Sequence, residues 1–79
     1  MTARVTVYGK PGCHLCDDAL EIVARVCADL GTSYDKVDIT DDPDLRRRFG
    51  EQIPVTFVDG RQLDFWRVDE RRLRAALGG

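Results

Sequence analysis

The sequence has no apolar run long enough to cross a bilayer, for which a helix needs about 20 apolar residues. No apolar stretch of the kind that forms a signal peptide follows Met1. The 79 residues are 43% hydrophobic and 33% charged, which is typical of an ordinary globular protein. We therefore expect one domain over residues 1–79 that is cytoplasmic and makes no contact with a membrane.

The sequence also has no large excess of charge of one sign. It contains 12 basic and 14 acidic residues, and its net charge is −2. Proteins that bind nucleic acid usually carry a basic patch. The basic run Arg46-Arg47-Arg48 is more simply explained as a solvated helix end, where cations complement the helix dipole. We expect a monomer with no nucleic-acid partner.

Metal ligands are scarce, since the chain has three cysteines and one histidine. A structural zinc site needs four such ligands. Cys13 and Cys16 form a C-x-x-C pair around His14, but Cys27 lies about 16 Å from Cys16 along a predicted helix. Cys27 is more simply a small buried apolar residue. We expect no metal site within one chain, and the odd number of cysteines argues against a disulfide-stapled secreted domain.

The start of the chain predicts a strand, a tight loop and a helix. Residues 4–8 alternate and are β-branched, and Gly9, Pro11 and Gly12 then break the strand. Apolar residues next recur at steps of three and four, which predicts a helix over 14–30 that ends at Gly31. Its expected buried face consists of Leu15, Ala19, Ile22, Val23, Val26 and Leu30.

This arrangement places Cys13 at a helix N-terminus and Cys16 one turn further along. The first turn of a helix has unpaired N–H groups and the positive end of the dipole, both of which favour an anionic thiolate. A thiolate is the nucleophile of disulfide exchange. The spacing therefore predicts that Cys13 attacks a disulfide and that Cys16 resolves the mixed disulfide.

The remaining pattern predicts an α/β fold with the order βαβ-α-ββα. A strand that returns after one helix is parallel to the first strand, whereas the Asp59-Gly60 turn favours an antiparallel hairpin. Asp42 and Asp69 are expected helix caps. In chain order we expect a strand at 34–39, a helix from Asp42 to Phe49, strands at 55–58 and 62–65, and a last helix after Asp69.

Four features together resemble a glutaredoxin-type member of the thioredoxin-fold superfamily, over nearly the whole chain. They are the Cys13-His14-Leu15-Cys16 motif after the first strand, Lys10 before it, Ile53-Pro54 before the third strand, and the Asp59-Gly60 hairpin. The resemblance implies a minimal thioredoxin/glutaredoxin fold, with a four-stranded mixed sheet flanked by helices. It also implies a thiol-disulfide oxidoreductase that takes part in electron transport and redox homeostasis.

The resemblance further implies roles for single residues. Sequence alone makes Pro54 a strand-start proline, but the resemblance implies a cis-proline that faces the cysteines. The Ile53 backbone would then pair with an extended substrate or a small thiol. Lys10 resembles the lysine that meets the glutathione carboxylate, with a solvated loop residue as the alternative. His14 adjoins the nucleophile, where it either stabilises the thiolate and meets substrate or is a solvent-facing spacer.

Two departures from the glutaredoxin pattern leave the reductant open. His14-Leu15 replaces the usual Pro-Tyr pair, and the usual Gly-Gly-x-Asp/Glu stretch is replaced by residues 65–70, in which only Asp69 overlaps the motif. The missing glycines remove a close backbone approach to a ligand. Trp66 and Arg67 are instead candidates for contacts with another small thiol or a protein, while packing against the last helix is the alternative for Trp66.

The sequence therefore predicts a dithiol oxidoreductase that reduces protein or low-molecular-weight disulfides and has no bound cofactor. Glutathione or another low-molecular-weight thiol is the expected reductant. One alternative is a dedicated electron donor that a thioredoxin-type reductase recharges. Two others are a metal or iron–sulfur module in which Cys13 and Cys16 of two chains bridge one ion, and a redox-inert interaction domain.

Overall fold

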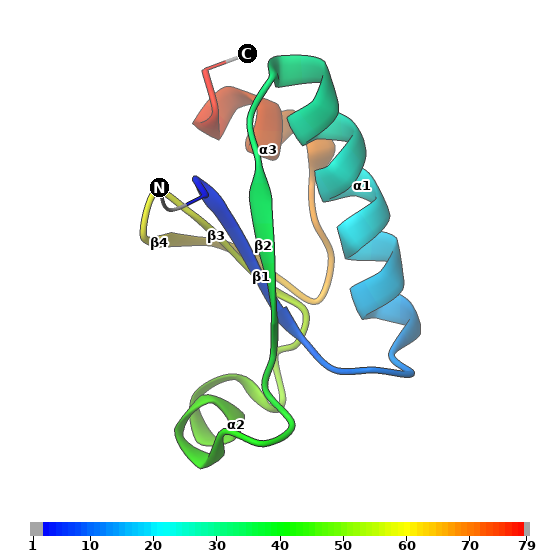
Figure 1. Cartoon of the computed structure of the whole chain (residues 1–79), viewed down its shortest axis with the longest axis vertical. Helices are drawn as coiled ribbons and strands as arrows, with labels where there is room; N and C mark the ends of the chain where they lie inside the picture. The colour runs from blue at the N-terminus through cyan, green and yellow to red at the C-terminus, as the bar shows by residue number, and fades with distance from the viewer. Residues whose placement is uncertain (1–2, 79) are drawn as a thin grey trace.

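The computed structural model describes residues 3–78, which form a four-stranded sheet and three helices (Figure 1). The order is βαβ-α-ββα, as predicted, and three strands begin or end one residue away from their expected bounds. In chain order the elements are β1 (Val5–Gly9), α1 (His14–Leu30), β2 (Tyr34–Asp38), α2 (Pro43–Phe49), β3 (Val55–Val58), β4 (Arg61–Phe65) and α3 (Glu70–Ala76).

The sheet is mixed, with the strand order β2-β1-β3-β4. β1 is parallel to β2, and the α1 crossover connects them, whereas β3 is antiparallel to both β1 and β4. Asp59 and Gly60 have φ angles of 52° and 83°, so the predicted tight turn joins β3 and β4. This topology confirms the minimal thioredoxin fold.

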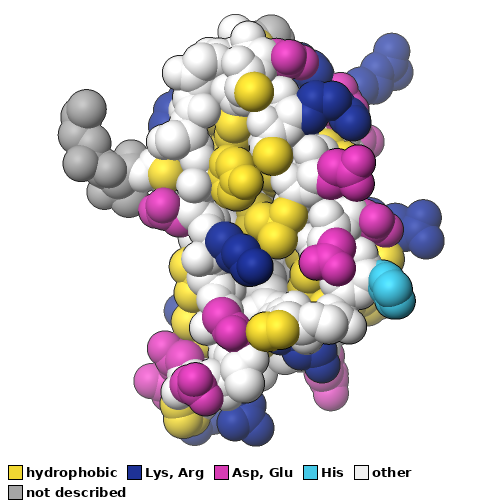
Figure 2. Space-filling model, turned by 45° about the vertical axis from the view of Figure 1, so that its right-hand side comes forward, with side chains coloured by type: hydrophobic (Ala, Val, Ile, Leu, Met, Phe, Trp, Pro, Cys, Tyr) yellow, Lys and Arg dark blue, Asp and Glu magenta, His cyan; other side chains and the backbone are white. Residues whose placement is uncertain are grey.

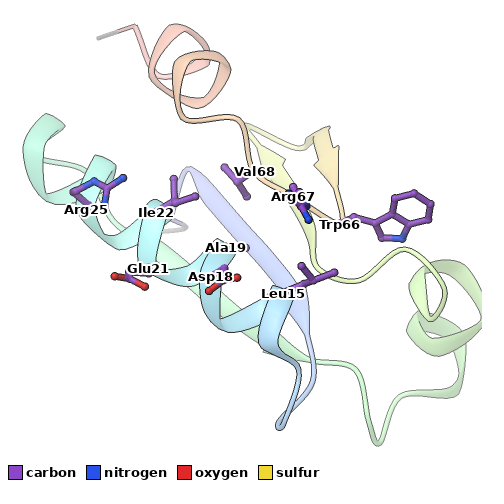
Figure 3. A pocket seen from close by; sticks show the side chains of 9 residues that line it. All are labelled: Leu15, Asp18, Ala19, Glu21, Ile22, Arg25, Trp66, Arg67 and Val68. Carbon is purple, nitrogen blue, oxygen red and sulfur yellow. The ribbon is translucent and has the colours of Figure 1, made fainter.

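Helix α1 has the bounds that the sequence predicts. Gly31 ends it in the left-handed region, at φ 68°, and donates its N–H to the Cys27 carbonyl. The second and later turns bury one face against the sheet, but Leu15 is 38% exposed. The expectation that Leu15 is buried was therefore wrong, because this first-turn residue points toward Trp66 instead of into the core (Figure 3).

The main core lies between the sheet and the helices α1 and α3, which run beside one face (Figure 1). Val5 and Leu73 are fully buried there, and each buried side chain of this size contributes about 1.5–3 kcal/mol. The other members are Val7, Ala19, Val23, Val26, Cys27, Val58, Val68 and Leu77. On the opposite face, Phe49 of α2 packs on Tyr8 and Phe57, with ring centroids 5.0 to 5.8 Å apart.

Ion pairs fasten α3 to the C-terminal half of α1. Glu70 accepts hydrogen bonds from Arg25 and Arg74, and Arg74 also pairs with Asp29 at 2.8 Å. The hydrogen bonds from these two arginines lower the pKa of Glu70. At the same end of the molecule, Arg4 pairs with Asp59 of the hairpin turn at 2.8 Å.

The two shorter helices begin at the aspartates that the sequence predicts as caps. Asp42 accepts hydrogen bonds from the N–H groups of Asp44 and Leu45, and Asp69 accepts one from Arg72. Within residues 3–78, no helix is both long and apolar enough to cross a membrane.

Candidate active site

Cys13 is the N-cap of α1, and its sulfur closes the first turn. Its backbone is extended, with φ −102° and ψ 113°, and its Sγ accepts a hydrogen bond from the N–H of Cys16 at 3.3 Å. Serine or aspartate oxygens usually make this contact. A thiolate at this position therefore receives a backbone N–H and faces the positive end of the helix dipole. Cys13 is partly exposed, so an incoming disulfide can reach it.

Cys16 lies one turn further along and is only 2% exposed. Burial, the hydrogen bond with Cys13 and the negative charge of Asp17 raise the pKa of Cys16 to about 11. Its thiol is therefore protonated at neutral pH. Cys13 is the more accessible of the two sulfurs and Cys16 is a buried thiol, which favours Cys13 as the attacking group and Cys16 as the resolving group.

Gly9 provides the space for the Cys16 sulfur, a role that the sequence analysis missed. A Cβ atom added to Gly9 would lie 2.9 Å from the Sγ atom of Cys16, which is closer than real Cβ atoms approach their neighbours. Gly9 was predicted only as a strand breaker, and a glycine that ends a strand before a C-x-x-C pair is the signal that could have indicated this close packing.

The Ile53–Pro54 peptide bond is cis, as the family resemblance implied. Tyr8 pairs with Val55, so the strand register places Pro54 across from Gly9, on which Cys16 packs. Pro54 is buried and Ile53 is partly exposed. Among the described residues, Ile53 forms no backbone hydrogen bond outside regular helices and strands, so its N–H and C=O can pair with a bound segment.

Lys10 and Ile53 lie together in a groove of about 420 Å³ between the C-x-x-C loop and α2. Arg46 also lines this groove, although the sequence analysis treated the whole arginine run as a solvated helix end. The other two arginines of the run make different contacts, because Arg47 pairs with Asp44 and Arg48 lies over the Phe49 ring. We call this the cationic groove, and its full lining is Lys10, Ile39, Thr40, Arg46, Gly50 and Ile53.

A second groove, of about 520 Å³, runs between α1 and the loop that leads into α3 (Figure 3). We call it the α1–loop groove. Its lining comes from α1 (Leu15, Asp18, Ala19, Glu21, Ile22, Arg25) and from the loop (Trp66, Arg67, Val68). Arg67 is therefore beside the first turns of α1, not in the cationic groove with Lys10.

Trp66 is 52% exposed and does not fill the core, so simple packing against α3 does not explain it. Its backbone is left-handed at φ 63°, a conformation that non-glycine residues seldom adopt. The backbone N–H of Trp66 donates to the Pro54 carbonyl at 2.8 Å, and the indole Nε1–H donates to the Glu51 carbonyl at 2.9 Å. These hydrogen bonds fix the ring beside the cis-proline segment.

The structure separates two other predicted site residues from both grooves. His14 is exposed at the start of α1 and lines neither groove. Asp69 caps α3, and its own N–H donates to Asp64 Oδ2 at 3.2 Å. A direct contact of Asp69 with a ligand would compete with this cap.

The described residues contain no group of three or more His, Cys, Asp or Glu side chains that could hold a metal ion. Cys27 is 2% exposed, and its thiol donates to the Ser33 carbonyl at 3.9 Å, as a small buried residue does. The burial of Cys16 also makes it a poor ligand for an ion shared with a second chain.

Comparison with known proteins agrees with this geometry. A family model of the glutaredoxin-like domain (DUF836) matches residues 4–78, which include Cys13, Cys16 and Pro54. The chain belongs to the glutaredoxin-like domain family. Membership of this family supports a redox-type function.

Two relatives cover nearly all of this glutaredoxin-like domain. An uncharacterised protein of Mycobacterium tuberculosis is 36% identical over an alignment of 79 positions, which covers 94% of this chain and 81% of that protein. The X-ray structure of protein XcR50 from X. campestris has 40% identity and a TM-score of 0.78, and the match covers 94% of this chain and 95% of that one.

A glutaredoxin of known structure shares the fold. The crystal structure of glutaredoxin C1 from Populus tremula x tremuloides has a TM-score of 0.61 at 23% identity, and the match covers 96% of this chain and 84% of that one. At this identity the likeness extends to the fold alone.

Proposed function

We propose that this glutaredoxin-like domain is a dithiol thiol-disulfide oxidoreductase that reduces protein or low-molecular-weight disulfides. The observation that carries the proposal is the pairing of a partly exposed Cys13, whose sulfur receives the Cys16 N–H at 3.3 Å, with a buried Cys16 one turn away. The first sulfur is accessible and lies at the positive end of the helix dipole. The second is protected until the first has reacted.

The reaction has two exchange steps. The Cys13 thiolate attacks one sulfur of the substrate disulfide, the substrate S–S bond breaks, and the departing sulfur takes up a proton. The Cys16 thiol then loses its proton and attacks Cys13 Sγ, which forms the Cys13–Cys16 disulfide and releases the second substrate thiol. The substrate gains two electrons and the protein loses two.

A reductant must return these electrons, and the cationic groove supports a low-molecular-weight thiol that carries a carboxylate, such as glutathione. Lys10 and Arg46 form no ion pair within residues 3–78 and can receive the carboxylate. The backbone of Ile53 can hydrogen-bond the peptide part of the thiol. A thioredoxin-type reductase is the alternative electron source.

Turnover of hydroxyethyl disulfide tests the proposal, with glutathione, a carboxylate-free thiol or a thioredoxin reductase as parallel electron sources. We expect the wild-type protein to turn over and Cys13→Ser to be inactive. Cys16→Ser should accumulate a mixed disulfide on Cys13, because the resolving thiol is missing. With glutathione, Arg46→Ala should raise KM, and Arg47→Ala, from the same helix, is the matched control.

Two results would contradict the proposal. A protein whose Cys13 is alkylated readily but which exchanges with no disulfide would be a redox-inert interaction domain. A wild-type protein that binds one metal ion per two chains, and loses both metal and dimer as Cys16→Ser, would be a metal module instead.

A further inference from the structure

We propose that the α1–loop groove is a docking site for a protein segment with an apolar side chain followed by basic residues. The inference rests on the proposed redox function, because the groove begins at Leu15, between the two cysteines. A partner seated there would present its disulfide to Cys13.

The floor of the groove is apolar, with Ala19 and Val68 buried and Ile22 partly exposed. Ala19, Ile22 and Val68 line it, and Leu15 and Trp66 are 38% and 52% exposed at one end. Figure 2 shows acidic side chains on the outer surface of α1, above the single histidine (cyan) at the start of that helix. Apolar surface of this kind, rimmed by charge, is characteristic of protein-binding sites.

The Trp66 wall is held rigidly before any partner arrives. Its indole Nε1–H is bound to the Glu51 carbonyl, and its backbone N–H to the Pro54 carbonyl. A fixed aromatic side chain loses little entropy on binding, and tryptophan is often among the residues that contribute most to an interface.

The charges on the rim select the chemistry of the partner. Asp18 and Glu21 are exposed on the α1 wall and form no ion pair within residues 3–78. The cation nearest to them on α1, Arg25, is already paired with Glu70. The rim therefore has two unpaired acids on the α1 wall and one cation, Arg67, on the loop wall. Its net charge is negative on the α1 side, where a basic segment fits.

A second copy of this chain fits the groove less well. Its net charge is −2, and a two-fold dimer formed through this groove would bring the acidic wall of one α1 against Asp18 and Glu21 of the other copy. Like charges in one interface cost binding energy. A basic partner brings the opposite charge instead.

The test uses short synthetic peptides, each joined through one cysteine to the same small thiol. One peptide carries leucine and two lysines beside its cysteine, a second carries leucine and two glutamates, and a third carries glycine and two lysines. Each peptide is made in two versions, one with these residues before the cysteine and one with them after it. The rate constant kcat/KM for their reduction is measured at low and at high salt, with hydroxyethyl disulfide as the uncharged reference.

We expect the leucine–lysine peptide to react about two- to fivefold faster than the leucine–glutamate peptide, as exposed charge pairs allow. The difference should shrink at high salt. Glu21→Lys should bring the ratio close to one, whereas Asp35→Lys should not. Asp35 is an exposed control with the same change of charge, and it pairs with Thr6, at the end of the sheet away from the cysteines.

Trp66→Gly tests the apolar wall. Glycine adopts the left-handed backbone at this position without strain, so the substitution removes the ring without forcing a new backbone conformation. We expect this variant to lose the preference for the leucine–lysine peptide over the glycine–lysine peptide. The peptide rates of this variant are each divided by its own rate with hydroxyethyl disulfide, so that a general loss of activity does not count as a loss of preference.

Each result that would overturn the docking site differs from a failure of the redox function. No reduction of hydroxyethyl disulfide would defeat the redox proposal itself. Normal reduction of this reference with equal rates for the charged peptides, or equal effects of Glu21→Lys and Asp35→Lys, would defeat the docking site alone. A concentration-dependent dimer that Leu15→Ser abolishes would also defeat it, because a second copy would then be the occupant.

Discussion

The two ends of α1 have different physical designs. The C-terminal half is fastened to α3 by the Arg25, Asp29, Glu70 and Arg74 ion pairs, over a core in which Leu73 is fully buried. At the N-terminal end, Leu15 is exposed and Cys13 is partly exposed. One helix thus anchors the fold at one end and presents a partly exposed sulfur at the other.

The cations of the molecule show the same contrast. At the anchored end Arg25 and Arg74 are paired with acids and Arg71 is not, whereas Lys10, Arg46 and Arg67, around the cysteines, all lack an ion-pair partner within residues 3–78. Unpaired cations near a nucleophile are available to substrate. Substitutions at the anchored end should therefore change stability, and substitutions at the reactive end should change activity.

The largest expected effect is that of Leu73→Ala at the anchored end. Removing a fully buried leucine side chain should lower the free energy of unfolding by roughly 2–5 kcal/mol, measured by urea denaturation. Leu15→Ala is the matched control and should cost less than about 1 kcal/mol, because its side chain is already 38% exposed. Equal losses at the two positions would contradict the comparison.

Cys16 is an exception to the division between a stability end and an activity end of α1, because it lies near the N-terminal end and we expect it to affect stability as well. Its pKa is about 11 in the folded protein, against an ordinary value of 9.0. Between these values the folded protein keeps a proton that the unfolded chain has lost. The free energy of unfolding of the reduced protein should therefore fall as pH rises from 9.0 to about 11, by roughly 2 kcal/mol.

Denaturation of reduced wild type and Cys16→Ala over this pH range measures the effect. The variant should lose clearly less stability than wild type, because the titrating thiol is gone. Parallel curves for the two proteins would show that Cys16 is not the group responsible.

Gly9→Ala should disturb both properties at once. The added Cβ would lie 2.9 Å from Cys16 Sγ, so we expect a loss of roughly 1–3 kcal/mol of stability and slower disulfide turnover. In a Cys16→Ala background the nearest remaining contact is the Cβ at 3.3 Å, and the cost should be smaller. An unchanged cost in that background would argue against close packing of glycine and sulfur.

The smallest effect is expected for Glu70→Gln, which removes the shared partner of Arg25 and Arg74. These pairs are largely solvated, so the loss of stability should be slight and should vanish at high salt. Because the pairs lower the pKa of Glu70, their contribution is present above the carboxyl's ordinary pKa and is lost as pH falls. Thermal unfolding at neutral and acid pH measures it, and disulfide turnover should not change.

The fold could be predicted from local signals that act on single residues. Gly31 ends α1, the aspartates Asp42 and Asp69 cap the later helices, and Asp59-Gly60 closes the hairpin, all as expected. Each signal depends on the backbone preferences of one or two residues. Tertiary context did not change them.

The candidate site was harder to predict, because its details depend on contacts between distant segments. Helical periodicity put Leu15 on the buried face, but it carries no information about where the sheet stops covering the helix. The arginine run gave no reason to distinguish Arg46 from its neighbours. No sequence pattern predicts a left-handed Trp66, because hydrogen bonds to residues far along the chain hold it there.

The central claim is that Cys13 is the nucleophile and Cys16 the protected resolving thiol. The most direct test treats the reduced protein with less than one equivalent of a small disulfide and maps the products by mass spectrometry. The account predicts a mixed disulfide on Cys13 in Cys16→Ser and a Cys13–Cys16 disulfide in wild type, with Cys27 unmodified. First modification at Cys16, or a wild-type protein that forms no Cys13–Cys16 bond, would contradict it.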